Sequence, residues 1–287
     1  PHECSSAASD VYKRQDGTQT IQNTRLMSRI MRSAFDLDAL VIQHAEDNEL
    51  SKDGQVNDGI IATKLGLQGI PDYAEKIIIE RDLTLLEDFN CRYHIAQISS
   101  EKSIEIIKNR KEIVKFTTGV SINNLSLNQN DIGDFRTFLK LSPPLRTEED
   151  RLSLIKGINQ NLIDVIVSDH KPEDEESKRL TFSQAATGAS GIETLLPLAL
   201  ELFHNGSIKL NKIIECMTCN PAKILKINKG SLSVGSDADL CIVDIYKPWV
   251  VKKEKMISKS KNTCIEDKKL QGKVLSTFIN GVELFKC

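Results

Sequence analysis

The stretch that most constrains this chain is Ile163–Pro172, where an apolar run passes directly into a polar cluster. Four of the five residues in 163–167 are β-branched and apolar, a composition typical of a strand buried on both faces of a parallel sheet. The polar cluster Ser168-Asp169-His170 follows at once. Barrels of the α/β class place catalytic groups in this way, at the C-terminal ends of buried strands. The alternative is that Asp169 only opens the next turn, where Asp is common.

Helix-like and strand-like runs alternate from residue 24 to residue 225, which indicates βαβ units and a parallel sheet. No Gly-x-Gly-x-x-Gly follows a predicted strand, so the polar strand ends favour a barrel mouth over a dinucleotide-binding sheet. After Leu225, short β-rich runs and the pair Asn280-Gly281 predict a small antiparallel unit. We expect strands near 40–44, 92–98, 113–118 and 163–167, and helices near 24–34, 71–89, 101–110, 146–159, 191–204, 210–219 and 221–225.

Charge and cysteine content narrow the classes of partner. The formal net charge of −2 and the pI near 6.3 show no basic field, so nucleic acid is not an expected partner. No apolar run approaches the roughly 20 residues that cross a bilayer, so no membrane partner is expected. Seven scattered cysteines suit free thiols in a reducing cytoplasm.

The first fifteen residues do not resemble the start of a domain. They show no hydrophobic period and no initiator Met. The run Ser5–Gln15 resembles translated sequencing-adapter sequence, and a native disordered tail fits its composition equally well. We therefore expect residues 1–15 to be a foreign or disordered tail and the chain to be truncated at its N-terminus.

Seven motifs occur in an order typical of one enzyme family. They are Val41–Asp47, Pro143–Asp150, Asp169-His170-x-Pro172, Gly191–Leu198, Asn220–Lys223, Gly235–Leu240 and Ser258–Thr263. From Asp16 to Phe285 the chain resembles the dihydroorotases, bacterial long-chain type, of the amidohydrolase superfamily. The resemblance implies the C-terminal part of a TIM-type (β/α)8 barrel over residues 16–228, followed by a small β-sandwich domain over 229–287.

The resemblance also implies a chemistry, the interconversion of dihydroorotate and carbamoyl aspartate in pyrimidine biosynthesis. In that family two divalent metals, usually zinc, activate a water at the barrel mouth. Asp169 matches the eighth-strand aspartate, a metal ligand that also accepts and returns the proton. His44 matches a fifth-strand metal ligand, and only Asp16 could match the bridging carboxylate. The resemblance also implies that Glu173, Thr187 and Gly188 occupy positions that bind the substrate.

Several positions depart from the family pattern. Gln97 stands where the sixth strand ends in His, and Asn123-Asn124 stand where the seventh strand is followed by two His. His94 cannot substitute for Gln97, because residues three apart on a strand point to opposite faces. Glu173 replaces a final His. Since an amide is a poor zinc ligand, we predict that the chain binds no stoichiometric binuclear zinc.

Three hypotheses remain open at this stage. The first is a dihydroorotase acting through a metal-bound hydroxide. The second is a non-catalytic homologue that binds aspartate transcarbamoylase, which the lost ligands favour. The third is a divergent amidohydrolase with another substrate, since fold alone does not fix function. An oligomer is expected under each of them.

Overall fold

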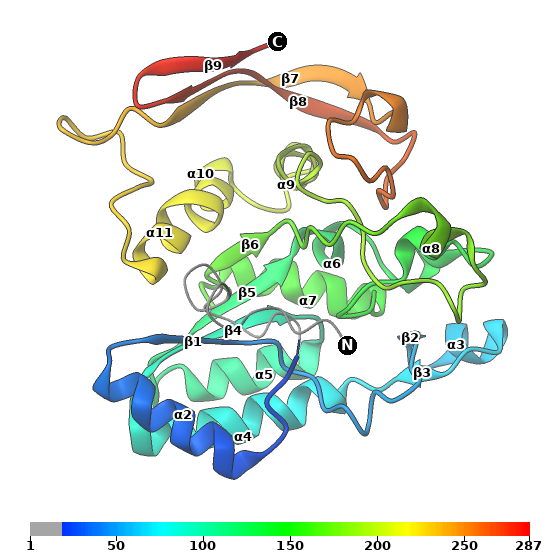
Figure 1. Ribbon diagram of the computed structural model, residues 1–287, viewed down its shortest axis with the longest axis vertical. Coiled ribbons are helices and arrows are strands. Elements are labelled where there is room, and N and C mark those ends of the chain that lie inside the picture. The colour runs from blue at the N-terminus through cyan, green and yellow to red at the C-terminus, as the bar shows by residue number, and fades with distance from the viewer. Residues whose placement is uncertain (1–18) are drawn as a thin grey trace.

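The computed structural model describes residues 19–287, in which four parallel strands form the central sheet (Figure 1). The strands are β1 (Leu40–Gln43), β4 (Arg92–Ile98), β5 (Thr117–Ser121) and β6 (Val165–Val167), in that order across the sheet. Each strand of this sheet lies beside the next sheet strand along the chain. The strands β2 (Val56–Asn57) and β3 (Gly69–Ile70), between β1 and β4, form a separate two-stranded sheet. The sheet therefore has the order of consecutive strands in an α/β barrel, and the predicted α/β class is confirmed.

Local sequence explains where several helices begin. The side chain of Asn23 caps the helix α2 by accepting a hydrogen bond from Leu26 N. Thr147 and Asp150 form a reciprocal capping box at the start of α7, which satisfies backbone N–H groups that have no partner within the helix. The helices of the barrel part are α2 (Thr24–Asp36), α3 (Ile60–Leu65), α4 (Tyr73–Phe89), α5 (Glu101–Arg110), α6 (Ile122–Ser126), α7 (Glu148–Asn159), α8 (Glu175–Arg179), α9 (Leu195–His204), α10 (Leu210–Ile214) and α11 (Asn220–Leu225).

Two predicted strands begin later than expected. The predicted strand 113–118 is wrong at both ends, because β5 runs from Thr117 to Ser121 and pairs Gly119 with Val165. Ile113 and Val114 instead close the turn after α5, with their N–H groups donating to the carbonyl of Arg110. The predicted strand 163–167 loses its first two residues, since β6 begins at Val165.

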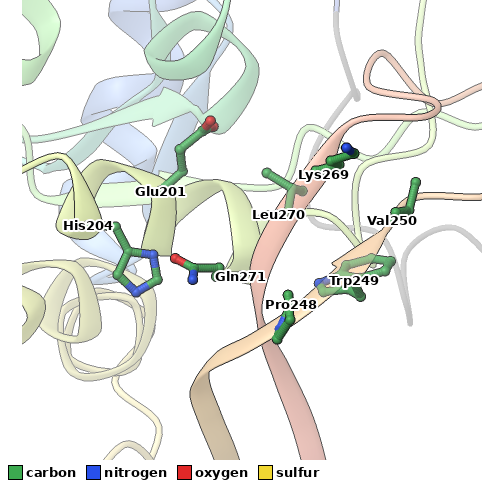
Figure 2. A pocket seen from close by; sticks show the side chains of 8 residues that line it. All are labelled: Glu201, His204, Pro248, Trp249, Val250, Lys269, Leu270 and Gln271. Atoms are coloured by element: carbon green, nitrogen blue, oxygen red, sulfur yellow. The ribbon is translucent and has the colours of Figure 1, made fainter.

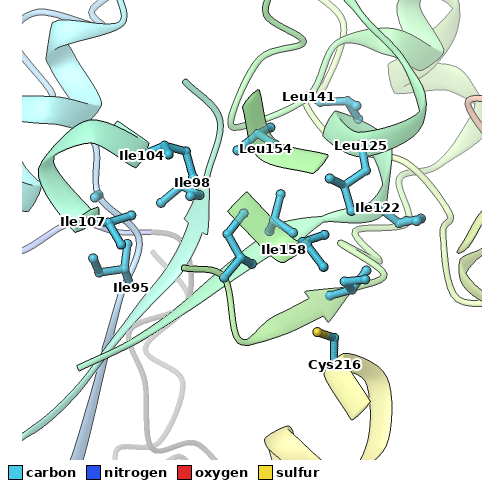
Figure 3. Packing of buried hydrophobic residues seen from close by; sticks show 14 of the residues in the cluster. Ile95, Ile98, Ile104, Ile107, Ile122, Leu125, Leu141, Leu154, Ile158 and Cys216 are labelled. Carbon is cyan, nitrogen blue, oxygen red and sulfur yellow. The ribbon is translucent and has the colours of Figure 1, made fainter. Parts of the chain in front are cut away.

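The core lies between the sheet and the helices around it (Figure 3). Ile95 and Ile98 of β4 are fully buried and pack with residues of α5 and α7, among them Ile107 and Ile158. Each such side chain contributes about 1.5–3 kcal/mol through removal from water. The apolar cluster fixes the strand positions, and so it fixes where the polar strand ends lie.

Two short strands and the helix α3 lie between β1 and α4. The strands β2 and β3 pair in parallel around α3. Arg146 connects this segment to the central sheet, because its guanidinium donates to Asn57 Oδ1 in β2 and to Ser99 Oγ directly after β4. No helix between residues 19 and 287 is long and apolar enough to cross a membrane.

The C-terminal unit is an antiparallel sheet of β7 (Leu240–Val250), β8 (Lys269–Ile279) and β9 (Val282–Lys286). Asn280 and Gly281 both have positive φ, 50° and 78°, as a two-residue hairpin turn requires, so the predicted hairpin is confirmed. Residues 19–287 supply one layer here, whereas a sandwich needs two facing layers. The predicted domain boundary at 228/229 falls between α11 and β7 and stays a prediction.

The C-terminal sheet rests on α9 (Figure 1). Trp249 packs against the core, and its Nε1 donates to the carbonyl of Gly272 at 3.0 Å. Figure 2 shows the pocket that remains between α9 and the strands β7 and β8, with Glu201 and His204 on the helix side. This pocket of about 440 Å³ contains none of the predicted site residues.

Candidate functional site

Three adjacent strands bring polar side chains together around Asp169. Gln97, near the end of β4, donates from Nε2 to Asp169 Oδ1 at 3.0 Å. Ser121, at the end of β5, donates from Oγ to Asp169 Oδ2 at 3.2 Å. Because β4, β5 and β6 are neighbours in a parallel sheet, their C-terminal ends meet at one edge. Gln97 and Asp169 therefore meet at this edge of the sheet.

Asp169 has an unusual backbone and an unusual carboxyl group. Its φ is +50°, the left-handed region that non-glycine residues rarely adopt. Burial raises the pKa of its carboxyl group above 3.8, and the hydrogen bonds from Gln97 and Ser121 and the charges of His44 and Lys171 offset this only in part. A carboxylate with a raised pKa is the better proton acceptor, so Asp169 suits acid–base chemistry.

His44 lies directly after β1 and is buried. Its Nε2 lies 3.3 Å from Ser142 Oγ and 3.5 Å from Glu46 Oε2. Burial pushes the pKa of Glu46 upward, but the hydrogen bond and charge of His44, together with Ser51 and Arg146, outweigh it, so the pKa lies below 4.5. The charge of His44 also lowers the pKa of Asp169, which places both groups in one electrostatic site.

The donor set of residues 19–287 does not fit a binuclear zinc centre. Among these residues, no three His, Cys, Asp or Glu side chains gather as metal ligands. Gln97 turns an N–H toward Asp169, whereas a ligand must present a lone pair. His94 points toward β5, where its Nδ1 lies 2.7 Å from Thr117 Oγ1, and it belongs to no group of three ligand side chains within residues 19–287. Asp16, the predicted bridging ligand, lies outside the described residues.

The predicted substrate-binding positions are arranged around Asn262. The buried Asn262 accepts at Oδ1 from Glu173 N at 3.4 Å and donates from Nδ2 to the carbonyl of Gly188 at 3.1 Å. Glu173 and Thr187 are half-buried. Gly188 has a φ of +138° and lies against Lys171, where a Cβ would come within 2.6 Å of the Lys171 carbonyl oxygen. The structure thus joins Glu173 to Gly188, through the segment Ser258–Thr263.

Polar atoms without partners mark the end of β5. Asn123 and Asn124 begin α6 and are each 2% exposed. Asn124 donates from Nδ2 to the carbonyl of Pro144 at 2.9 Å, yet its Oδ1 and the Nδ2 of Asn123 find no partner within residues 19–287. Buried amide atoms of this kind cost free energy unless a water or ligand satisfies them.

Sequence reasoning missed two residues that contact the site. Ser121 holds Asp169, and Ser142 contacts His44. Ser121 pairs with Val167 in the sheet, so a correctly placed β5 would have put its side chain beside the end of β6. For Ser142, no sequence signal indicated a contact with His44.

The chain was compared with protein families and with known sequences. The family model described as "Amidohydrolase family" matches residues 8–284. A dihydroorotase of Ehrlichia canis (strain Jake) is 41% identical over 268 residues, covering 93% of this chain and 60% of that protein. A dihydroorotase of Acetivibrio thermocellus is 39% identical over 268 residues, with 93% and 63% covered. The chain thus spans about 60% of the length of these relatives.

Solved structures show the same fold at lower identity. An L-hydantoinase from Arthrobacter aurescens superposes with a TM-score of 0.83 at 24% identity, covering 95% of this chain and 62% of the other. A dihydropyrimidinase from Brevibacillus agri gives 0.80 at 22% identity, with 91% and 59% covered. These likenesses confirm the predicted TIM-type α/β barrel and concern the fold alone. On the family model and these likenesses together, the chain belongs to the amidohydrolase family.

Proposed function

We propose that this chain belongs to a dihydroorotase-like hydrolase that interconverts dihydroorotate and carbamoyl aspartate in pyrimidine biosynthesis. The observation that carries the proposal is the 41% identity to a dihydroorotase over 93% of the chain. Asp169 supports it, because a half-buried carboxylate with a raised pKa follows β6, where a barrel enzyme places its catalytic groups. The proposal includes a small cyclic amide as the substrate of the enzyme and the cytoplasm as its location.

Asp169 has the properties that hydrolysis of a cyclic amide requires. Water must lose a proton as it attacks the carbonyl carbon, and the ring nitrogen must gain one as its bond to that carbon breaks. One carboxyl group can perform both transfers in turn. Gln97 and Ser121 each occupy one oxygen of Asp169, which fixes its orientation while further lone pairs stay available.

Zinc enters the proposal only through the family resemblance. The side chains of residues 19–287 do not supply the ligands of a binuclear centre. We therefore assign no step of the reaction to a metal and confine the roles to groups of this chain. His44 and Asp169 are the two side chains here that match family ligands.

A second candidate function is a non-catalytic homologue that binds aspartate transcarbamoylase. The hydrogen bond from Gln97 to Asp169 favours it, since an amide has taken the place of an imidazole ligand. A divergent amidohydrolase with another substrate is the third candidate. Association into an oligomer is part of each proposal.

The test is an assay on a chimera in which this chain replaces the matching part of the Ehrlichia canis dihydroorotase. Under the first proposal the chimera hydrolyses dihydroorotate and the change Asp169→Asn abolishes turnover. The matched control is Asp174→Asn, an exposed carboxylate in the following loop, which should keep turnover. A folded chimera without turnover that co-elutes with aspartate transcarbamoylase would instead support the second function. One with neither property would contradict both.

A further inference from the structure

The histidine next to Asp169 makes contacts that the proposed chemistry does not use. His170 Nδ1 accepts hydrogen bonds from two backbone N–H groups, Gly191 N at 3.2 Å and Ile192 N at 3.4 Å. A ring nitrogen can accept only while it carries no proton. The contacts therefore require the tautomer of His170 with its proton on Nε2.

The same two segments are joined along their backbones. Lys171 N donates to the carbonyl of Ala189 at 2.9 Å, and His170 forms a parallel bridge with Ala189. Gly191 comes so close to the turn that an added Cβ would overlap the carbonyl oxygen of Ser168. The turn 168–171 thus packs directly on the segment 189–192, and His170 provides the side-chain part of that contact.

Asp169 lies inside this turn in a conformation that needs support. Its φ of +50° is sparsely populated for a residue with a side chain, and it persists only where the surrounding structure holds it. The carboxyl group is held by Gln97 and Ser121 from other strands. The backbone is held from the other side, by the contacts of His170 and Lys171 with residues 189–192.

We infer that His170 is a positioning residue, whose Nδ1 anchors the left-handed turn and thereby aims the Asp169 carboxyl group at the strand ends. His170 is exposed, so packing in the core does not explain its two backbone contacts. It acts through Asp169 and touches no reacting atom. The inference concerns the arrangement of Asp169 and holds whichever reaction the site performs.

The first test reads the tautomer in the unaltered chain. Long-range nitrogen–proton correlation spectra at about pH 8, where free imidazole is neutral, distinguish a protonated Nε2 from a protonated Nδ1. We expect His170 to show a single tautomer with the proton on Nε2. A proton on Nδ1, or rapid averaging between the two tautomers, would overturn the inference.

The second test compares two amide substitutions of the same ring. His170→Asn places an acceptor oxygen where Nδ1 stood, whereas His170→Gln places its polar atoms where Nε2 stood. We expect hydrogen exchange of the Gly191 and Ile192 amides to be about tenfold faster in His170→Gln, and close to the unaltered rate in His170→Asn. The Gln97 carboxamide resonances should shift in His170→Gln and return in His170→Asn.

Rescue by His170→Asn separates a positioning role of His170 from a general effect on stability. His204→Gln makes the same chemical change on α9 and serves as the matched control, with exchange at Gly191 unaltered. Amides of β4 and α4 report whether each variant is folded, and the tautomer measurement needs no variant. Equal exchange in His170→Gln and the unaltered chain would contradict the inference, as would failure of His170→Asn to rescue. None of these measurements uses enzymatic activity, so they stand apart from the proposed function.

Discussion

Asp82 is a buried carboxylate that joins a helix to two strands. From α4 it accepts hydrogen bonds from Tyr93 Oη at 2.6 Å on β4 and from Gln43 Nε2 at 2.9 Å on β1. Arg81 completes the set with an ion pair at 2.7 Å. Burial raises the pKa of Asp82, and these partners offset the effect only in part. The network fixes β1 and therefore the position of His44 at its end.

Removing one donor from this network should lower stability measurably. Tyr93 is 2% exposed, and Tyr93→Phe deletes a hydrogen bond to a buried charged group, which is worth about 2 kcal/mol. We expect the free energy of unfolding in urea at neutral pH to fall by about that amount. The control is Tyr73→Phe, since Tyr73 is exposed and the change should stay within about 0.5 kcal/mol. Equal losses in the two variants would contradict the role of the network.

His94 should make stability depend on pH. Burial lowers the pKa of His94 from 6.5 to about 4. Between these two pH values His94 is protonated in the unfolded chain and neutral in the folded chain. The contribution of neutral His94 to the free energy of unfolding is complete above the unfolded-state pKa of 6.5. It is lost as the pH falls toward the folded-state pKa of about 4, a loss of about 3 kcal/mol.

Urea unfolding measured at several pH values tests this contribution. His94→Asn keeps a polar partner for Thr117 Oγ1 and should flatten the profile between pH 6.5 and about 4. His204→Asn, a histidine change on α9, serves as the control and should keep the slope of the unaltered chain. Parallel profiles for His94→Asn and the unaltered chain would show that His94 titrates normally in the folded state.

At the scale of elements, the strand β4 was predicted at its observed bounds of Arg92–Ile98, whereas the predicted helix 191–204 begins only at Leu195. The 3.6-residue period and the cap at Asn23 placed α2, and α5 was predicted at its observed bounds of Glu101–Arg110. The prediction for β5 was displaced because residues 113–116 alternate exposed Ile113 and Lys115 with buried Val114 and Phe116, as a strand would, without joining the ladder. The true centre of β5 is Gly119, a residue that strand propensities disfavour.

The reason for Gly119 is tertiary and could not be predicted from the local sequence. A Cβ at this position would overlap the carbonyl oxygen of Ala96 on the neighbouring strand. The same limit applies to the site. The position of Asp169 could be predicted from the strand pattern, while the contacts of Ser121 and Ser142 depend on strand register and on a distant loop.

Contact between the C-terminal sheet and α9 depends on one glycine. Gly272 has a φ of +104°, and a Cβ there would overlap Leu200 Cδ1 on the helix. Gly272→Ala should therefore cost both backbone strain and overpacking, about 3 kcal/mol together in urea unfolding. Gly206→Ala is the matched control, since φ is +76° there with no atom within 4 Å, and should cost about 1 kcal/mol. Similar costs would show that the sheet adapts freely to the helix.

At the scale of the whole molecule, the ligand set predicts a low zinc content. We expect elemental analysis of the dialysed chain to find well below one zinc per chain, because residues 19–287 gather no three ligand side chains. Asp169→Asn should leave that content unchanged. A content close to two zinc per chain would contradict the assignment of a site without binuclear ligands.

We predict that Glu173 is a second obstacle to hydrolysis of dihydroorotate, through its charge. Its backbone is fixed, since Asn262 accepts from its N–H and its carbonyl accepts from Ser260 Oγ at 2.6 Å. The family resemblance implies a histidine at this position, so under the proposed function Glu173 would bring a negative charge toward the anionic carboxylate of dihydroorotate. Like charges about 4 Å apart cost on the order of 4 kcal/mol at an effective dielectric of 20, nearly three decades in binding.

Restoring the sixth-strand imidazole alone should therefore not restore full activity. In the chimera with the Ehrlichia canis dihydroorotase, Gln97→His supplies an imidazole beside Asp169, but Glu173 and Asn123-Asn124 still differ from the family pattern. We expect this variant to hydrolyse dihydroorotate slowly, and Glu173→His to raise the rate at least as much as Gln97→His does. The measurement is kcat/KM for the chimera, both single variants and the double variant. If Gln97→His alone reaches the rate of the parent enzyme, the charge of Glu173 has no part in the deficit and the loop after β6 tolerates either residue.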